Sequence, residues 1–286
     1  MLAASGLKRF HGLLLLLPLL VTGCVATTPA SVAPRIGVQL WSVKDEIQRD
    51  FDGTLAKLAA LGFEGVEFAG EFGRYRSDPA RLRAFLGEHG LRCIGAHVGL
   101  DQLDAKNFAA TTSFYHTVGC NDLIVPFDNR GVSAAGMVLV AGDVSQLSAR
   151  LRPLGMRTGY HNHAQEMAGP DGQTGWDLFA RATPASVILQ QDIGWTNAAG
   201  KDPVALIRRY PGRSVSLHYK AKFAPGTSGT PLIGQDRTDW GAVTQAARSV
   251  GGTSWLIVEQ EEYPNGMGQI EAVSASLQGL RAALAK

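Results

Sequence analysis

The chain has 286 residues, of which 45% are hydrophobic and 18% are charged, and its formal net charge is +2. This length and composition provide enough apolar material for a sizeable core. The positive and negative side chains are scattered and nearly balanced. That distribution argues against a nucleic-acid surface and against a polybasic membrane surface.

The N-terminus has the features of an export signal. The basic pair at positions 8–9 precedes the apolar run GLLLLLPLLVTGC, which is too short to span a bilayer and contains a proline. The residues VTGC end at Cys24 and resemble the bacterial lipobox, whose cysteine is lipidated and becomes the mature N-terminus. A plain signal peptide cut nearby is the alternative. We expect a signal peptide over 1–23, then a lipidated cysteine and flexible tether over 24–34. The protein would be exported and anchored facing the periplasm.

Two further cysteines, Cys93 and Cys120, are isolated in the sequence. Export would permit a disulfide, but two isolated cysteines make neither a disulfide scaffold nor a zinc knuckle. Buried thiols are the expected state.

From Arg35 onward, short apolar runs alternate with helix-like segments. Each run is the length of a strand, and its apolar and β-branched composition is typical of a buried parallel strand. In chain order, the runs are RIGVQL, EGVEF, RCIGAHV, DLIVPF, MRTGYH, SVILQQD, SVSLHYK and SWLIVEQ.

Helical segments are predicted between these runs, for example over 53–62, 77–90 and 201–212, and the last two contain an Asp-Pro start signal. Single glycines separate helix ends from the next run, a position that often requires a left-handed backbone. These are Gly62, Gly90, Gly119, Gly155 and Gly251. The least regular stretch, 126–144, is predicted to be an elaborated loop after the fourth run.

Eight such units in about 250 residues match the size of a (β/α)₈ barrel. An open, doubly wound sheet is the main alternative, but it would place a glycine-rich phosphate loop after its first strand. The segment GVQLWSVKDE is not such a loop. We therefore expect an α/β fold in which residues 35–286 form a single TIM barrel.

Ionisable side chains stand at the C-terminal ends of six of the eight runs, where the chemistry of such barrels collects. They are Glu67, His97, His161 with His163, Asp192, His218 with Lys220, and Glu259 with Glu261. Taken singly, each has a structural explanation, such as a hydrogen-bonded histidine or a rim ion pair. Burying them together would be costly for every unpaired charge, and a divalent cation removes that cost. Mixed oxygen and nitrogen donors suit Mn²⁺, Mg²⁺, Co²⁺ or Zn²⁺.

An ordered set of segments resembles the xylose isomerase-like TIM-barrel superfamily, which contains the sugar phosphate isomerases/epimerases and is related to the endonuclease IV fold. The segments are GVQLWSVKDE, GFEGVEFAG, GAHV, GYHNHAQEM, QQDIGWTNAAGKDP, LHYK, TDW and IVEQEE. The resemblance implies one divalent metal held by Asp192, His218, Glu259 and a fifth-strand ligand. Glu166 is the preferred fifth-strand ligand and His161 the competitor. Relatives often have His-x-Lys-Asp where this chain has Ala221, so no carboxylate role is assigned there.

The resemblance implies proton abstraction next to a sugar carbonyl, through an enediolate that the cation stabilises. In ketose 3-epimerases, two metal-bound glutamates on opposite faces exchange the proton, and here these would be Glu166 and Glu259. The remaining catalytic candidates are His161 and Lys220. The candidates for substrate contact are His97, His163, Glu67 and Trp195.

The same enediolate would lead to elimination if a leaving group lay β to the carbanion, which would make the protein a lyase acting on 3-keto-glycosides. A non-catalytic sugar-binding lipoprotein would need the barrel mouth but no metal. A nuclease resembling endonuclease IV would need more zinc ligands and a basic groove. We expect a metal-dependent sugar isomerase or epimerase, with the lyase as the main alternative. Its partner would be a small sugar or keto-sugar, with no nucleic acid, and it would contact the membrane only through its lipid anchor.

Overall fold

A computed structural model describes residues 1–3, 6 and 34–285. Of the expected signal peptide, only positions 1–3 and 6 fall within the described residues, and Cys24 lies outside them. The chain divides into two units, Met1–Val32 and Ala33–Lys286, and the second holds the fold. Within the described residues, no helix is long and apolar enough to cross a membrane.

Eight parallel strands form one sheet in the order β6-β5-β4-β3-β2-β1-β8-β7. The strands are β1 (Arg35–Gln39), β2 (Gly65–Phe68), β3 (Arg92–His97), β4 (Asp122–Val125), β5 (Arg157–His161), β6 (Ile188–Gln190), β7 (Ser216–Tyr219) and β8 (Trp255–Val258). Each predicted run contains one of them. A parallel bridge between Asp192 and His218 joins the two edges of the sheet. The predicted single (β/α)₈ barrel is confirmed as a nearly closed barrel.

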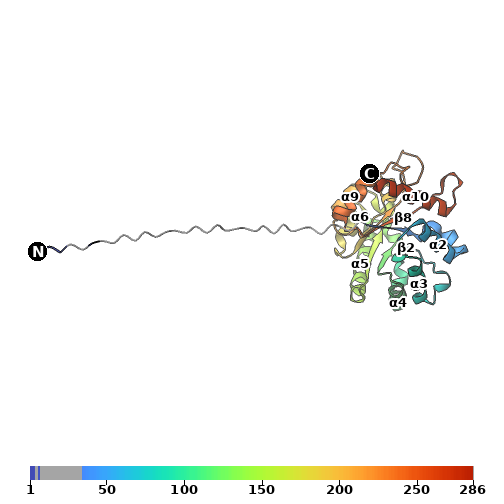
Figure 1. Ribbon diagram of the computed structural model, residues 1–286, viewed down its shortest axis with the longest axis horizontal. Helices are drawn as coiled ribbons and strands as arrows, with labels where there is room; N and C mark the ends of the chain where they lie inside the picture. The colour runs from blue at the N-terminus through green and yellow to red at the C-terminus, as the bar shows by residue number, and fades with distance from the viewer. Residues whose placement is uncertain (4–5, 7–33, 286) are drawn as a thin grey trace. The chain divides into compact units, whose positions relative to one another are not determined.

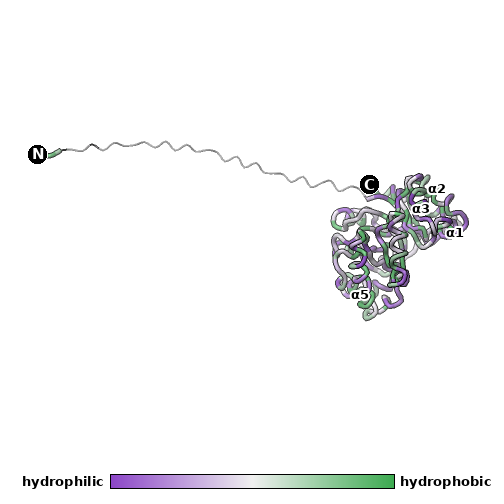
Figure 2. Tube along the Cα trace, turned by 90° about the horizontal axis from the view of Figure 1, so that it is seen from below, coloured by the Kyte–Doolittle hydropathy of each residue, from purple (hydrophilic) through white to green (hydrophobic). Residues whose placement is uncertain are grey.

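Helices surround the strands, as Figure 1 shows for α2 to α6, α9 and α10 around β2 and β8. The helices are α1 (Lys44–Arg49), α2 (Phe51–Leu61), α3 (Pro79–Glu88), α4 (Phe108–Val118), α5 (Ala134–Leu151), α6 (Gly175–Ala182), α7 (Ile193–Ala198), α8 (Pro203–Arg209), α9 (Trp240–Ala246) and α10 (Gln269–Leu284). Figure 2 shows hydrophobic and hydrophilic residues mixed along α5. This mixture fits a helix with one face on the barrel and one face in water.

The prediction of a loop over 126–144 was wrong for most of that stretch. A 3₁₀ turn at Asn129–Val132 is followed directly by α5, whose first turn is capped where Ser133 Oγ accepts a hydrogen bond from Gly136 N at 3.1 Å. The buried residues Met137, Val140, Ala141, Val144 and Leu147 recur at helical spacing. The three glycines of this stretch hid that period.

Four of the five predicted glycines have the positive φ of a left-handed backbone: Gly62, Gly90, Gly119 and Gly155. Before β8 the left-handed residue is Gly252 (φ 72°) and not Gly251, which ends a short π-helical turn. The expected position was therefore one residue too early.

Cys93 and Cys120 form a disulfide, so the expectation of buried thiols was wrong. Their Cα atoms are 5.0 Å apart, and they are 27 positions apart in the chain. The parallel pairing of β3 with β4 has the same offset, with Ala96 opposite Leu123. Extending that register toward the strand starts places the two cysteines opposite each other, which spacing in the sequence alone did not reveal.

Candidate metal centre

The strands deliver their polar residues to one end of the barrel. Glu67 lies within β2, and His97 and His161 are the last residues of β3 and β5. Asp192, His218 and Glu259 come from the ends of β6, β7 and β8. Because all eight strands are parallel, these side chains meet at the C-terminal face, as the sequence predicted.

Four of these residues form a compact set of potential ligands, which we call the donor group. Single ligand atoms of His161, Asp192, His218 and Glu259 all lie within 4.8 Å of one another, and all four residues are buried. Two imidazoles and two carboxylates are a donor set that divalent transition metals accept.

Two atoms of the donor group also lack protein hydrogen bonds. In the described part of the chain, His161 Nδ1 and Asp192 Oδ2 are buried without a hydrogen-bond partner. Buried polar atoms of folded proteins are nearly always paired. The residues present therefore fit a divalent cation, with His161, Asp192, His218 and Glu259 as the residues that would hold it.

His218 is held from both sides by carboxylates. Its Nδ1 is 2.9 Å from Glu259 Oε2, and its Nε2 is 2.6 Å from Glu67 Oε2. Burial lowers the pKa of His218, but Glu67 and Glu259 outweigh that effect and raise it to about 10, so a bound cation would replace one of the two ring protons. A histidine that binds metal through one ring nitrogen commonly donates the other N–H to a carboxylate. Glu67 is placed for that supporting role.

Glu67 is fully buried among protein groups and does not face the pocket, although it was expected to contact substrate. Its carboxylate accepts hydrogen bonds from Gln39 Nε2 at 2.7 Å and from Gln190 Nε2 at 2.6 Å. Burial raises its pKa, but His97 and His218 outweigh burial and leave the pKa lowered. Glu67 is therefore a buried anion that orients the imidazoles.

Lys220 brings a positive charge into the same cluster. Its Nζ lies 2.7 Å from Glu259 Oε2, 2.9 Å from Glu261 Oε2 and 3.1 Å from Asp192 Oδ2, the last outside hydrogen-bond geometry. Burial lowers its pKa, but these carboxylates reverse the shift and raise it, so Lys220 is a cation. A Cβ at Gly194 would lie 2.6 Å from the Lys220 carbonyl oxygen, so only glycine allows this approach of α7 to β7.

Glu166 does not join the donor group, although it was the preferred fifth-strand ligand. Its Oε1 accepts a hydrogen bond from Tyr160 Oη at 3.1 Å, and its Oε2 accepts one from His163 N at 2.8 Å. Burial raises its pKa. The three-residue step from His163 to Glu166 makes a local turn that the carboxylate closes on its own backbone. His161, the competitor, occupies the fifth-strand position instead.

His163 and Trp195 lie beside each other near the mouth, with ring centroids 5.5 Å apart. Among the described residues, His163 Nδ1 and Trp195 Nε1 are buried without hydrogen-bond partners. Burial first, and Lys220 second, lower the pKa of His163 to about 4. The His163 imidazole is therefore neutral, and the described protein groups satisfy neither its Nδ1 nor the indole N–H of Trp195.

A pocket of about 500 Å³ opens above the donor group. Its size falls within the range of about 300–1,000 Å³ that is usual for small-molecule sites. It is lined by Trp41, Ala69, Gly70, His97, Gly99, Gln102, Pro126, Phe127, His161, His163, Glu259 and Glu261. We call it the mouth pocket.

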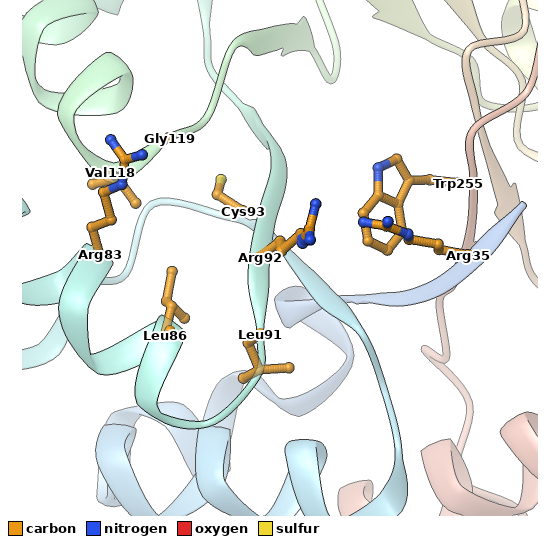
Figure 3. A pocket seen from close by; sticks show the side chains of 10 residues that line it. Arg35, Arg83, Leu86, Leu91, Arg92, Cys93, Val118, Gly119 and Trp255 are labelled. Atoms are coloured by element: carbon orange, nitrogen blue, oxygen red, sulfur yellow. The ribbon is translucent and has the colours of Figure 1, made fainter.

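A second pocket, of about 450 Å³, lies at the opposite end of the barrel. Arg35, Arg92 and Trp255 line it, and these are the first residues of β1, β3 and β8. Figure 3 shows the Arg35 side chain beside the Trp255 ring, with Arg83 across the pocket next to Gly119. Because strand starts and strand ends are at opposite faces, this basic pocket is separate from the donor group.

Comparison with known proteins places the chain in a family. A family model described as "Xylose isomerase-like TIM barrel" matches residues 55–283. The chain belongs to this family. Among solved structures, a sugar phosphate isomerase/epimerase from Parabacteroides distasonis superimposes with a TM-score of 0.70 at 23% identity, covering 86% of this chain and 96% of that one. At that identity, the likeness shows that the two proteins share the xylose isomerase-like fold.

Two curated relatives of this xylose isomerase-like barrel are dehydratases. An inosose dehydratase from Lacticaseibacillus casei is 23% identical over 257 residues, which cover 75% of this chain and 83% of that protein. A 3-dehydroshikimate dehydratase from Pseudomonas aeruginosa is 27% identical over 202 residues, which cover 65% of this chain and 30% of that protein.

The structure adds site residues that the sequence reading missed. Gln39 and Gln190 anchor Glu67, and Trp41 and Phe127 line the mouth pocket. All four stand at or just after the C-terminal end of a predicted run. Reading those ends for amides and aromatic rings, as well as for ionisable groups, would have found them.

Proposed function

We propose that the protein is a divalent-metal-dependent lyase that removes the proton next to the carbonyl of a keto-sugar and expels an oxygen substituent from the β carbon. The observation that carries this proposal is the position of the two glutamates. An epimerase of the two-glutamate type needs a carboxylate on each face of the substrate. Glu259 is in the donor group, whereas both oxygens of Glu166 are bound to Tyr160 and to the His163 backbone.

A divalent ion bound by the donor group would polarise the substrate carbonyl and lower the pKa of the adjacent C–H. The His163 imidazole lines the mouth pocket, and among the described residues its Nδ1 has no hydrogen-bond partner, so it is the group that we assign to take that proton. The electron pair of the broken C–H bond forms the enolate and then the C=C bond as the β C–O bond breaks. The charged Lys220, whose Nζ lies 2.7 Å from Glu259 Oε2, places a positive charge beside the donor group that would stabilise the negative charge of the enolate.

The leaving oxygen requires a proton as it departs. Glu261 lines the mouth pocket, its side chain is 26% exposed, and it is paired with Lys220 at 2.9 Å. The proton that His163 takes from the carbon would pass to the departing oxygen by way of Glu261, so the aglycone leaves as a neutral alcohol and His163 returns to its neutral form. The names of the two curated relatives support a dehydratase-type outcome, since both denote the removal of water.

Isomerisation or epimerisation is the competing outcome because it begins with the same proton abstraction. The decisive experiment is an NMR assay in D₂O with the metal-loaded protein, offering free ketoses and 3-keto-glycosides. Release of the aglycone supports the lyase. Deuterium uptake without bond cleavage would instead establish an isomerase or epimerase, and bound metal without either change would leave a binding protein.

Export and lipidation at Cys24 belong to this proposal. The disulfide between Cys93 and Cys120 supports an oxidising compartment. Labelling of cells with a radioactive fatty acid, with Cys24→Ala as the control, tests the anchor. Label that persists in the variant would place the lipid elsewhere.

A further inference from the structure

Two aromatic rings stand exposed beside the candidate metal centre. Trp41 is 45% exposed and Phe127 is 38% exposed. Over the described residues, they are the two aromatic side chains among the exposed large hydrophobics, and both line the mouth pocket with His161 and Glu259. Exposed apolar surface that continues into a polar cleft usually marks a ligand site.

Both rings are held in place from the protein side. Lys44 Nζ lies 4.2 Å from the centroid of the Trp41 ring. Phe127 packs edge-on against His163, with ring centroids 5.7 Å apart. These contacts fix the rings while leaving a large part of each in water, which favours a binding role over a packing role.

Four residues of the pocket lining are small or uncharged. Ala69, Gly70, Gly99 and Pro126 contribute little bulk, so the lining includes more than the donor-group residues His161 and Glu259. The charged residues that line it are Glu259 and Glu261. Among described residues no arginine or lysine is part of the lining, while Lys44 lies over the Trp41 ring and Lys220 is already paired with both glutamates. This lining disfavours a phosphorylated ligand and suits a neutral one.

We propose that Trp41 and Phe127 form an outer subsite that binds the aglycone ring of a neutral glycoside while the keto-sugar ring lies over the donor group. This inference rests on the proposed function and names its substrate class. The apolar C–H face of a second sugar, or an aryl ring, packs against exposed aromatic faces. His163 contacts Phe127 of the outer subsite edge-on, and its ring centroid also lies 5.5 Å from that of Trp195.

The test uses glycosides without a ketone, which bind but cannot react. Affinities of phenyl and methyl glucosides, as both anomers, are measured for the metal-loaded full chain by calorimetry and saturation-transfer NMR. We expect the phenyl glucoside to bind about tenfold more tightly than the methyl glucoside. Trp41→Ala and Phe127→Ala should remove this preference, whereas Leu139→Ala, at a 61% exposed site on α5, should keep it.

Equal affinity for the two glucosides, or a preference that survives in both variants, would overturn the outer subsite. Trp41→Phe keeps a ring and should retain most of the preference, so a loss there with intact thermal unfolding would also count against it. Glucose 6-phosphate binding more tightly than the methyl glucoside would overturn the neutral class. The phenyl preference without turnover of any keto-glycoside would support the subsite and refute the lyase.

Discussion

Asp192 and His218 form the bridge that closes the sheet between β6 and β7. The same two residues belong to the donor group. His218 N also donates a hydrogen bond to Gln191 O at 3.0 Å across this seam. The backbones of these two residues therefore help to close the barrel, and their side chains help to form the metal centre.

Metal removal is consequently expected to lower stability as well as activity. A cation that binds only the folded state, at a concentration 100 times its Kd, stabilises that state by about 2.7 kcal/mol. Chelation should lower the midpoint of thermal unfolding, and added Mn²⁺ or Zn²⁺ should restore it, as followed by calorimetry with metal analysis. If Lys220 alone neutralises the carboxylates, the chelator will have no effect.

Glu259→Gln should reduce turnover by about 100-fold or more, because the variant loses a carboxylate of the donor group. The bound metal per chain, measured by elemental analysis, should fall in parallel while the circular dichroism spectrum stays unchanged. Glu262→Gln is the matched control, since Glu262 is a 53% exposed side chain paired with Lys222. Full activity in Glu259→Gln would remove this residue from the mechanism.

The variant Glu166→Gln distinguishes the proposed lyase from the competing isomerase or epimerase. The amide oxygen of Gln can still accept the hydrogen bond from His163 N, and its NH₂ group can donate to Tyr160 Oη, because a hydroxyl oxygen also accepts. The variant should therefore keep its metal and lose less than about tenfold in kcat. A loss as large as that of Glu259→Gln, with metal retained, would instead identify Glu166 as a proton-transfer group and favour an epimerase.

The barrel was predictable from the sequence because its signals are local. Each buried parallel strand is a short apolar run, and glycines such as Gly62 and Gly119 mark the helix ends. The prediction for the stretch 126–144 was wrong because Gly136 and Gly142 interrupt the helical period of α5, and Gly131 lies in the turn before it. Packing of the buried face of α5 against the rest of the barrel outweighs the free-energy cost of placing glycine inside a helix.

The position of the candidate site at the C-terminal ends of the strands was predictable from the sequence. The identity of each residue that forms it was less predictable. Parallel strands bring their ends together, so Asp192, His218 and Glu259 could be grouped from sequence. The choice between His161 and Glu166 depends on side-chain direction in a turn, which spacing does not fix. The disulfide likewise depends on the register of β3 against β4, and not on distance along the chain.

The disulfide between Cys93 and Cys120 should contribute about 3.5 kcal/mol to the free energy of unfolding, as expected for a closed loop of 27 residues. Urea unfolding with and without a reductant measures this difference. The double variant Cys93→Ser/Cys120→Ser should match the reduced protein and show no response to reductant. A reductant effect that persists in the double variant would assign the stabilisation to another group.

Asp177 should make stability depend on pH in the acid range. At the start of α6, its Oδ1 accepts hydrogen bonds from Tyr210 Oη at 2.5 Å and Arg209 Nη1 at 3.0 Å, and its Oδ2 accepts one from Thr174 Oγ1 at 2.7 Å. Burial raises the pKa of Asp177, but these hydrogen bonds outweigh it and lower the pKa. A carboxyl whose pKa is lowered by folding stabilises the native state above its unfolded pKa of about 3.9.

That stabilisation is lost as the pH falls through the lower, folded pKa, because the protonated carboxyl binds these donors less well. Urea unfolding should therefore show Asp177→Asn less stable than the wild type at pH 7. The difference should shrink steadily below about pH 4. Asp171→Asn, at a side chain that is 70% exposed, should show a small difference at both pH values. If Asp177→Asn is less stable than the wild type by the same amount at pH 7 and at pH 3, the residue acts through its shape and through neutral hydrogen bonds, and not through its charge.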